Sequence, residues 1–439
     1  MDAWQQRHQL QQAVRRQPAD FIAWVMLADC ELEAGDLRAG EAAARQALQL
    51  RPGHPEALAR LGRVAWMAGA HADAARLLGQ AAAQVPGHPG ITLWLGHALE
   101  DSGDAEGAAA AYQRAHALLP DEPYIAAQRL AWQRRLCDWR GLDALSRQVR
   151  AAVAAGHGAI EPFAFLSEEA GPDEQLACAR LRAAQISAQV RPMPPATVRR
   201  QGVLQIGFLS NGFGAHPTGL LTAALFEQLG AEPALQVHLF ALTPDDGSTI
   251  RQRLGTATRL HAVVDMRHAE IAAHIRATGI DVLFDLRGWG GGGAPQVLAM
   301  RPAPLQINWL AYPGTSGAPW IDAVIGDAFA LPPALEPYYS ERVLRLPRAF
   351  QPSDTTRVLH EVPTRASCGL PEAGVVFCCF NNSYKLNPRS MQRAFAVLRQ
   401  VPGSVLWLLS GPGQADARLR AAAQAAGLDP ARLGFMGKL

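Results

Sequence analysis

The N-terminal part of the chain repeats with a period of 34. Prolines, glycines, leucines and alanines each recur at this interval, and the four series stay in phase. They comprise Pro18, Pro52, Pro86 and Pro120; Gly35, Gly69 and Gly103; Leu27, Leu61 and Leu95; and Ala47, Ala81 and Ala115. Such a repeat folds as stacked copies of one supersecondary unit, each too small to bury its apolar face alone. The period therefore excludes a single globular core for this region.

A period of 34 is typical of the tetratricopeptide repeat, a helix–turn–helix unit. We predict three units at about 19–52, 53–86 and 87–120, so that 1–120 forms the repeat region, with a preceding helix in 1–18. The glycines turn the chain between paired helices and the prolines end each second helix. Small residues let the paired helices approach closely: Ala28, Gly62 and Gly96.

Arrays of this kind usually present a concave groove to a peptide or protein. We therefore expect a polypeptide partner, although neither an asparagine ladder nor an arginine cluster identifies it. The alternative is that the repeats only stack and stabilise the chain.

Beyond the repeats, the pattern predicts a helical connector and linker (121–200), with the linker itself at 191–201, and then two α/β regions. The first α/β region spans 201–352, a crossover follows at 353–373, and a partial second region spans 374–439. Strand-like runs alternate with helical segments, which indicates parallel sheets covered by helices. These runs are 203–210, 235–242, 260–265, 281–286, 305–311, 323–327, 375–381, 404–410 and 432–437.

Composition narrows the classes of protein. Lys plus Arg number 41 and Asp plus Glu 39, a balance unlike that of a nucleic-acid binder. We expect no membrane span and no signal peptide, because the apolar runs are short and the N-terminus is polar. Six scattered cysteines do not form a disulfide framework, so we expect a cytoplasmic protein. The oligomeric state is left open.

Three loops at predicted strand ends are candidates for chemistry, because ligands bind there in parallel sheets. In FGAHPTG, His216 stands between a predicted strand and a predicted helix, and Pro217 directly follows it. We expect Thr218 to cap that helix. The glycine-flanked turn YPGTSG contains Gly314, Thr315 and Ser316, whose backbone N–H groups suit an anion.

The third loop, FNNSYKLNP, follows a strand expected to be buried and leads into a helix. Lys385 lies near that helix N-terminus, where backbone donors favour phosphate, and a lysine there can neutralise a departing diphosphate. Asn382 and Tyr384 add donors in the same loop. The alternative is an ordinary solvated turn. No Asp-x-Asp triplet occurs, so a sugar transferase built this way would replace the usual metal by Lys385 and helix-terminal amides.

The repeats together with GFLSNGFGAHPTG, RPAPLQINWLAYPGTSGAPWIDAVIGD and CCFNNSYKLNPRSMQ resemble the bacterial O-linked N-acetylglucosamine transferase family. The resemblance implies a GT-B fold of two Rossmann-like lobes. It also implies transfer of N-acetylglucosamine from UDP-GlcNAc to Ser or Thr of proteins, with inversion and without a metal or other cofactor.

Carried over by motif, the resemblance makes His216, Tyr384 and Lys385 catalytic, with His216 as a general base or a positioning group. Asn382 and Lys385 would contact the nucleotide, and Pro217 and Thr218 would lie beside the substrate. The turn with Gly314, Thr315 and Ser316 would line the sugar and phosphate pocket.

The resemblance also implies that the second lobe is incomplete in 439 residues, so we expect a truncated chain or one completed by a partner chain. Two other functions stay open. One is a non-catalytic interaction module with a transferase-like remnant; the other is a GT-B enzyme with a different nucleotide sugar or acceptor.

Overall fold

The computed structural model describes residues 3–196, 202–358 and 361–437. Contacts within the chain define two compact units. One contains 1–148 together with 363–439, and the other contains 149–362. Part of the predicted linker, 197–201, lies outside the described residues.

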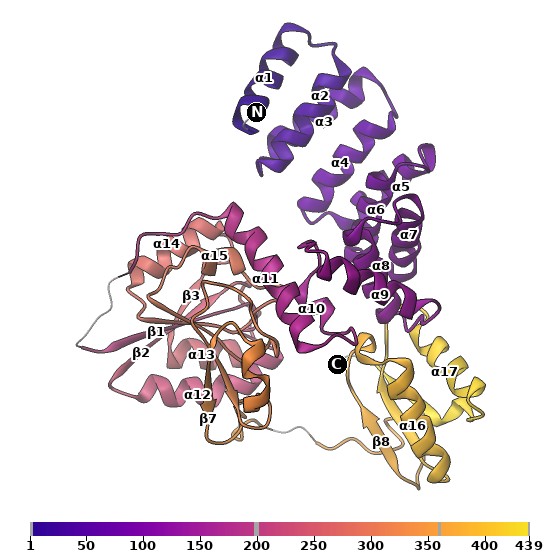
Figure 1. Ribbon diagram of the computed structural model, residues 1–439, viewed down its shortest axis with the longest axis vertical. Helices are drawn as coiled ribbons and strands as arrows, with labels where there is room; N and C mark the ends of the chain where they lie inside the picture. The colour runs from indigo at the N-terminus through magenta and orange to yellow at the C-terminus, as the bar shows by residue number, and fades with distance from the viewer. Residues whose placement is uncertain (1–2, 197–201, 359–360, 438–439) are drawn as a thin grey trace. The chain divides into compact units, whose positions relative to one another are not determined.

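Antiparallel helix pairs stack one after another along the array, as Figure 1 shows. The observed order, a helical repeat array followed by parallel-sheet α/β structure, confirms the predicted fold class. The array helices are α1 (Ala3–Arg16), α2 (Phe21–Glu33), α3 (Leu37–Leu50), α4 (Pro55–Met67), α5 (His71–Gln84), α6 (Pro89–Asp101), α7 (Ala105–Leu118) and α8 (Pro123–Arg135).

The repeated residues act locally as their chemistry requires. Gly35, Gly69 and Gly103 have φ of +78°, +79° and +88°, a left-handed conformation that ends the first helix of each pair at low cost. A Cβ added to Gly62 would lie 2.6 Å from Leu78 Cγ of the facing helix, so glycine is needed for that close packing.

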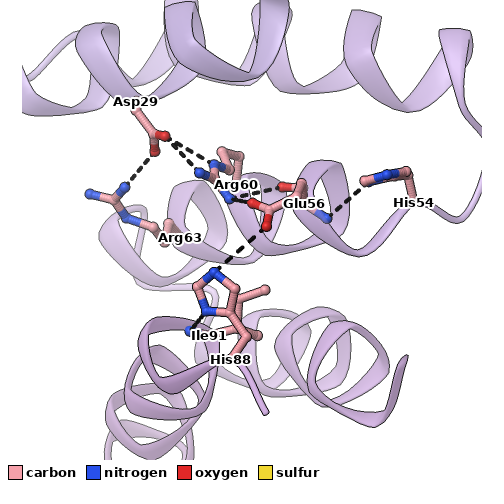
Figure 2. A network of polar contacts seen from close by, with 7 residues as sticks. All are labelled: Asp29, His54, Glu56, Arg60, Arg63, His88 and Ile91. Atoms are coloured by element: carbon pink, nitrogen blue, oxygen red, sulfur yellow. Dashed lines mark hydrogen bonds and ion pairs between the residues drawn. The ribbon is translucent and has the colours of Figure 1, made fainter. Parts of the chain in front are cut away.

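Polar side chains join successive repeats, as Figure 2 shows. The carboxylate of Asp29 on α2 accepts hydrogen bonds from Arg60 and Arg63 on α4 at 2.7–3.1 Å. Glu56 pairs with Arg60 on its own helix and lies 3.6 Å from His88 Nε2, at the start of α6. These contacts fix neighbouring first helices to one another.

The same unit contains a small α/β segment after the crossover. Its three parallel strands lie in the order β10-β9-β8. The strand expected to be buried is the edge strand of this sheet, and Cys378 in it is exposed. The elements are β8 (Val376–Cys379), η2 (Ser383–Lys385), α16 (Pro388–Gln400), β9 (Val405–Leu409), α17 (Ala415–Ala425), η3 (Pro430–Arg432) and β10 (Leu433–Met436).

The second unit is built on a seven-stranded parallel sheet in the order β3-β2-β1-β4-β5-β6-β7. Helix α9 (Leu142–Ala154) spans the boundary between the units, and α10 (Pro162–Phe165) and α11 (Pro172–Gln189) precede the sheet. The strands are β1 (Leu204–Ser210), β2 (Leu235–Ala241), β3 (Arg259–Ala262), β4 (Val282–Asp285), β5 (Leu305–Asn308), β6 (Ala323–Asp327) and β7 (Arg342–Leu346). The remaining helices are α12 (Pro217–Ala231), α13 (Thr249–Ala257), α14 (His268–Thr278), α15 (Pro295–Ala299) and η1 (Pro333–Tyr338).

The strand order reverses between β1 and β4, because the chain runs from β1 outward to β3 and then returns to the other side of β1. In open parallel sheets, ligands bind at the carboxyl ends of the strands that flank such a reversal. The predicted loops FGAHPTG and YPGTSG follow β1 and β5, and the glycine-rich segment RGWGGGG (287–293) follows β4 between them. All three therefore lie at one edge of the sheet.

Candidate active site

His216 begins helix α12 at the carboxyl end of β1. Its Nδ1 accepts a hydrogen bond from the backbone N–H of Thr218 at 3.1 Å, so His216 itself is the N-cap. The expectation that Thr218 caps the helix is wrong: Thr218 lies inside the first turn, is 3% exposed, and receives the hydroxyl of Thr222 on its carbonyl. Pro217 occupies the first helical position and is exposed.

Close packing fixes the His216 loop. A Cβ on Gly212 would lie 2.6 Å from His216 Nδ1, and one on Gly219 would lie 2.3 Å from the carbonyl oxygen of Gly214. Two side chains hold the loop from outside: Asp246 accepts the N–H of Ala215 at 2.7 Å, and Arg251 donates to the carbonyl of Phe213 at 2.7 Å. The imidazole is thus presented by a rigid turn.

The hydrogen bond to Nδ1 determines the tautomer of His216. A neutral ring that accepts at Nδ1 carries its proton on Nε2, which is then a donor. Burial, and then the positive charge of Arg287, lower the pKa of His216. The ring is therefore neutral near pH 7, with Nε2–H as the group not engaged by the cap.

Arg287 was not singled out from the sequence, although it begins the RGWGGGG loop after β4. Its backbone N–H and that of Gly288 donate to the buried carboxyl of Asp285, whose pKa is raised by burial. Its guanidinium donates to the carbonyl of Gly291 at 2.5 Å, while its buried Nε has no partner in the described residues. A basic residue opening a glycine-rich loop at a strand end was the signal for this cation.

A buried carboxylate accepts hydrogen bonds from the YPGTSG turn. Glu341, 4% exposed, accepts the hydroxyl of Thr315 at 2.6 Å and the backbone N–H of Ser316 at 2.5 Å. The hydroxyl of Thr315 therefore points into the protein, whereas Ser316 Oγ accepts the backbone N–H of Ala318 at 3.3 Å, and the backbone of Gly314 packs on Tyr312. That this turn contacts a sugar or phosphate stays a prediction.

The FNNSYKLNP loop lies at the carboxyl end of β8 in the other unit. Asn382 caps the short helix η2, Tyr384 is half-buried, and Lys385 is exposed with its Nζ 3.4 Å from Asn381 Oδ1. Helix α16 begins three residues later, capped by Asn387 in a reciprocal capping box with Ser390. The ammonium group is thus close in sequence to a helix N-terminus and open to solvent.

Lys385 stands out by residue type. Lys385 and Lys438 are the only lysines among 41 basic residues. A lysine carries a compact point charge on a flexible stem, whereas an arginine presents a planar fork. Apart from Lys438, every other basic residue of the chain is an arginine, so the lysine at 385 is a choice particular to this loop.

The predicted site residues fall into two groups. His216, Pro217 and Thr218 lie together at the end of β1, and the turn at Gly314, Thr315 and Ser316 lies at the same sheet edge, joined to the RGWGGGG loop by the indole N–H of Trp289 on the carbonyl of Ser316. Asn382, Tyr384 and Lys385 form a second group in the other unit. Within the residues described, no set of three or more His, Cys, Asp or Glu side chains is arranged to hold a metal ion.

Together, these features define a class of protein. It combines a helical repeat array with a doubly wound parallel sheet, and the candidate loops of that sheet lie at its switch point. Residues 182–363 and 355–437 match the profile of glycosyl transferase family 41, and 7–55, 31–89 and 65–130 match tetratricopeptide-repeat profiles. The chain belongs to glycosyl transferase family 41.

Individual relatives agree with this assignment. The chain is 32% identical over 309 residues to a probable UDP-N-acetylglucosamine–peptide N-acetylglucosaminyltransferase of Arabidopsis thaliana, covering 66% of this chain and 31% of that protein. It is 24% identical over 348 residues to the Caenorhabditis elegans UDP-N-acetylglucosamine–peptide N-acetylglucosaminyltransferase, covering 53% and 30%. The chain thus spans less than a third of the length of these relatives.

Among solved structures, a mutant Thermobaculum terrenum O-GlcNAc transferase superimposes with a TM-score of 0.61 at 25% identity. The match covers 95% of this chain and 74% of that one. It thus extends over both the repeat array and the α/β regions.

Proposed function

We propose that the protein transfers N-acetylglucosamine from UDP-GlcNAc to Ser or Thr hydroxyls of polypeptides, with inversion and without a metal. The observations that carry the proposal are a capped, neutral His216 at the end of β1 and a solvent-facing Lys385 at the end of β8, both in a member of family 41. The names of the relatives supply the sugar donor and the acceptor class.

In this proposal, His216 positions the reacting groups and does not take a proton at Nδ1. The lone pair of Nδ1 is used by the N–H of Thr218, and protonating it would break the cap of α12. The Nε2–H is left to donate to an oxygen of the acceptor or the sugar. Of the two roles open to this histidine, the geometry favours the positioning one.

Lys385 neutralises the diphosphate as it leaves. Its ammonium group stabilises the transition state because negative charge develops on the departing phosphate oxygens. Its Nζ has one long contact, to Asn381, so little is lost when it turns to a phosphate oxygen. Asn382 and Tyr384 supply further polar contacts to the nucleotide from the same turn. The turn with Gly314, Thr315 and Ser316 contributes backbone shape to the sugar pocket.

The repeat array binds the acceptor polypeptide, as arrays of this class commonly do. Exposed apolar side chains on its first helices, Ile22 and Met26 on α2 and Met67 on α4, give such a segment apolar contacts. No helix in the described part of the chain is long and apolar enough to cross a membrane. Because all six cysteines are free thiols, we place the activity in the reducing cytoplasm.

The test is transfer from radiolabelled UDP-GlcNAc to protein acceptors, measured with the unaltered chain and with His216→Ala, Lys385→Ala and Lys385→Arg. We expect both alanine variants to lose roughly 100-fold or more in rate, as when a positioned transition-state donor is removed. Lys385→Arg keeps the charge but not the compact geometry, so it should recover only part of the loss.

Two controls separate chemistry from folding. His157→Ala removes an exposed histidine outside the site and should leave transfer unchanged, and thermal unfolding should be the same for all variants. Full activity of His216→Ala and Lys385→Ala would refute the assignment of roles. Transfer to small molecules in place of proteins, detected by mass spectrometry, would refute the acceptor class.

A further inference from the structure

We propose that Ser383, anchored on the end of repeat helix α8, is a positioning residue for the donor-binding Lys385. This inference rests on the proposed function, because it assumes that Lys385 contacts the diphosphate. It concerns only contacts inside the unit that contains both the array and the small sheet.

Helix α8 continues the phase of the array. It starts at Pro123, one full period after Pro89, and is followed by Cys137, one full period after Gly103. Cys137 has φ of +50°, the left-handed conformation that glycine adopts at the same point of each repeat. A side chain in this conformation costs about 1–2 kcal/mol, so the contacts of the Cys137 side chain have to offset that cost.

The Cys137 side chain lies in the apolar core of the small sheet. It is 3% exposed and packs in one cluster with Leu386 and Met391 and with residues of β9 and α17. Burial raises the pKa of its thiol to about 12, which keeps it protonated and able to donate. Its Sγ–H points to the carbonyl oxygen of Ser383 at 3.8 Å. The turn that ends α8 is therefore part of the structure that supports the donor loop.

A second contact fixes the same serine from its other side. Ser383 is 5% exposed, and its hydroxyl donates to the carbonyl oxygen of Arg135 at 2.6 Å. Arg135 is the last residue of α8, where the final carbonyls have no partner inside the helix. The hydroxyl therefore satisfies a helix end and holds the loop to it in one step.

Ser383 controls Lys385 through the short helix between them. The N–H of Lys385 donates to the carbonyl of Asn382 at 3.0 Å, and that of Leu386 donates to Ser383 at 2.9 Å. Because the side chain of Lys385 is exposed, the backbone of this turn determines the position of its Cα, and so the region that its ammonium group can reach. Moving Ser383 would move Lys385, whereas Asn381 and Asn382 are exposed and have no comparable anchor within the described part of the chain.

The experiment is a double-mutant cycle read by calorimetric binding of UDP to the full chain. The four proteins are the unaltered chain, Ser383→Ala, Lys385→Ala and the double variant. We expect Ser383→Ala to weaken UDP binding roughly three- to tenfold, the size of one lost hydrogen bond. In the Lys385→Ala background the same change should alter affinity less than about twofold, since coupled residues are non-additive.

Ser404→Ala is the matched control. Ser404 is fully buried in the same unit, and its hydroxyl also donates to the carbonyl of a helix end, Val401, at 2.7 Å. It should leave UDP affinity unchanged even if it lowers stability. Ser383→Thr keeps the hydroxyl and should bind UDP almost as the unaltered chain does, which provides a second variant if the alanine form folds poorly.

The outcomes distinguish the two proposals. If Lys385→Ala binds UDP as well as the unaltered chain, or if the unaltered chain does not bind UDP, the proposed function fails and the inference fails with it. If Lys385→Ala weakens binding but Ser383→Ala does not, or if the two losses simply add, the role of Lys385 stands and only the positioning role of Ser383 is overturned.

Discussion

The loop of His216 and the loop of Lys385 follow parallel strands in the same way but are held by different means. The His216 loop is fixed inside its own sheet unit by glycine contacts and by Asp246 and Arg251. The Lys385 loop has an exposed lysine and depends, through Ser383, on a helix end far earlier in the chain, at Arg135. The first loop is built by local packing, and the second is built by a distant repeat.

This difference explains how the array and the sheet segment form one unit. The guanidinium of Arg418 on α17 donates to both carboxylate oxygens of Glu106 on α7 at 2.8 Å. Together with the Ser383 and Cys137 contacts, this pair joins α7 and the end of α8 to the small sheet at separate points. Changes in the array are therefore expected to reach Lys385 but not His216.

The largest expected effect is that of Gly219→Ala on the locally built loop. The new Cβ would lie 2.3 Å from the carbonyl of Gly214, so the His216 turn must shift. We expect stability to fall by about 1–3 kcal/mol and transfer to fall about 100-fold, as for a displacement of about 1 Å. UDP affinity should not change, because Lys385 lies in the other unit. Kinetics and calorimetry on one preparation measure both.

Gly79→Ala is the control for this substitution. Gly79 lies in α5 with nothing within 4 Å of the added atom, so the change should stabilise the helix by about 1 kcal/mol. If Gly219→Ala weakens UDP binding as strongly as transfer, the two loops are not independent and the comparison is wrong.

Arg418→Ala should have a moderate effect confined to the Lys385 side. The pair with Glu106 is bidentate but partly exposed, at 27% and 40%, so its loss should cost about 1 kcal/mol. We expect faster hydrogen exchange in 380–388 and no change in 211–219, measured by mass spectrometry. Arg267→Ala removes an exposed pair within α14 and serves as the control. Equal exchange changes in both loops would contradict the separation.

The pH dependence of activity should report on the His216 loop alone. The charge of Arg287 contributes, after burial, to the lowered pKa of His216. Removing it in Arg287→Gln should raise that pKa toward its ordinary value. Because the neutral ring is the competent form, activity should then be lost at a higher pH on acidification. The measurement is the fall of kcat/KM on the acid side of its pH profile. Arg287→Lys keeps the charge and should leave this acid limb where it is. If the limb does not move in Arg287→Gln, it does not report the titration of His216.

The same two loops show what sequence could and could not predict. The period of 34 and the alternation of strands and helices were sufficient for the fold class, and the motifs were sufficient for the family. Strand β7 and helix α13 were missed, because RVLRL is a short edge strand with two arginines and no regular alternation, and TIRQRLGTA is short and polar. The sheet order and the Glu341 support of the YPGTSG turn depend on contacts between residues distant in the sequence, which no local pattern encodes.

Cys137 is a signal that the sequence did contain. It stands one full period after Gly103, at a position where the earlier repeats have a glycine with positive φ. A cysteine at such a position indicates that its side chain makes a contact that a glycine could not make. Period alone placed the end of the array near Pro120, since Arg129 and Leu130 replace the small and apolar residues of the earlier repeats.

The smallest expected effect tests this interpretation through a reciprocal exchange. Cys137→Gly relieves about 1–2 kcal/mol of backbone strain and loses a buried CH₂ and its sulfur, together about 1–2 kcal/mol of apolar burial, so the free energy of unfolding should stay nearly constant. Gly103→Cys adds the strain at a site where nothing lies within 4 Å of the new atom, so it should destabilise the chain by about 1–2 kcal/mol. Urea unfolding measures both. Equal losses in the two variants would mean that the Cys137 side chain contributes more than its burial, through the hydrogen bond to Ser383. A gain of stability in Cys137→Gly would mean that its place in the core is worth less than the strain, and the joint between array and donor loop would then rest on Ser383 alone.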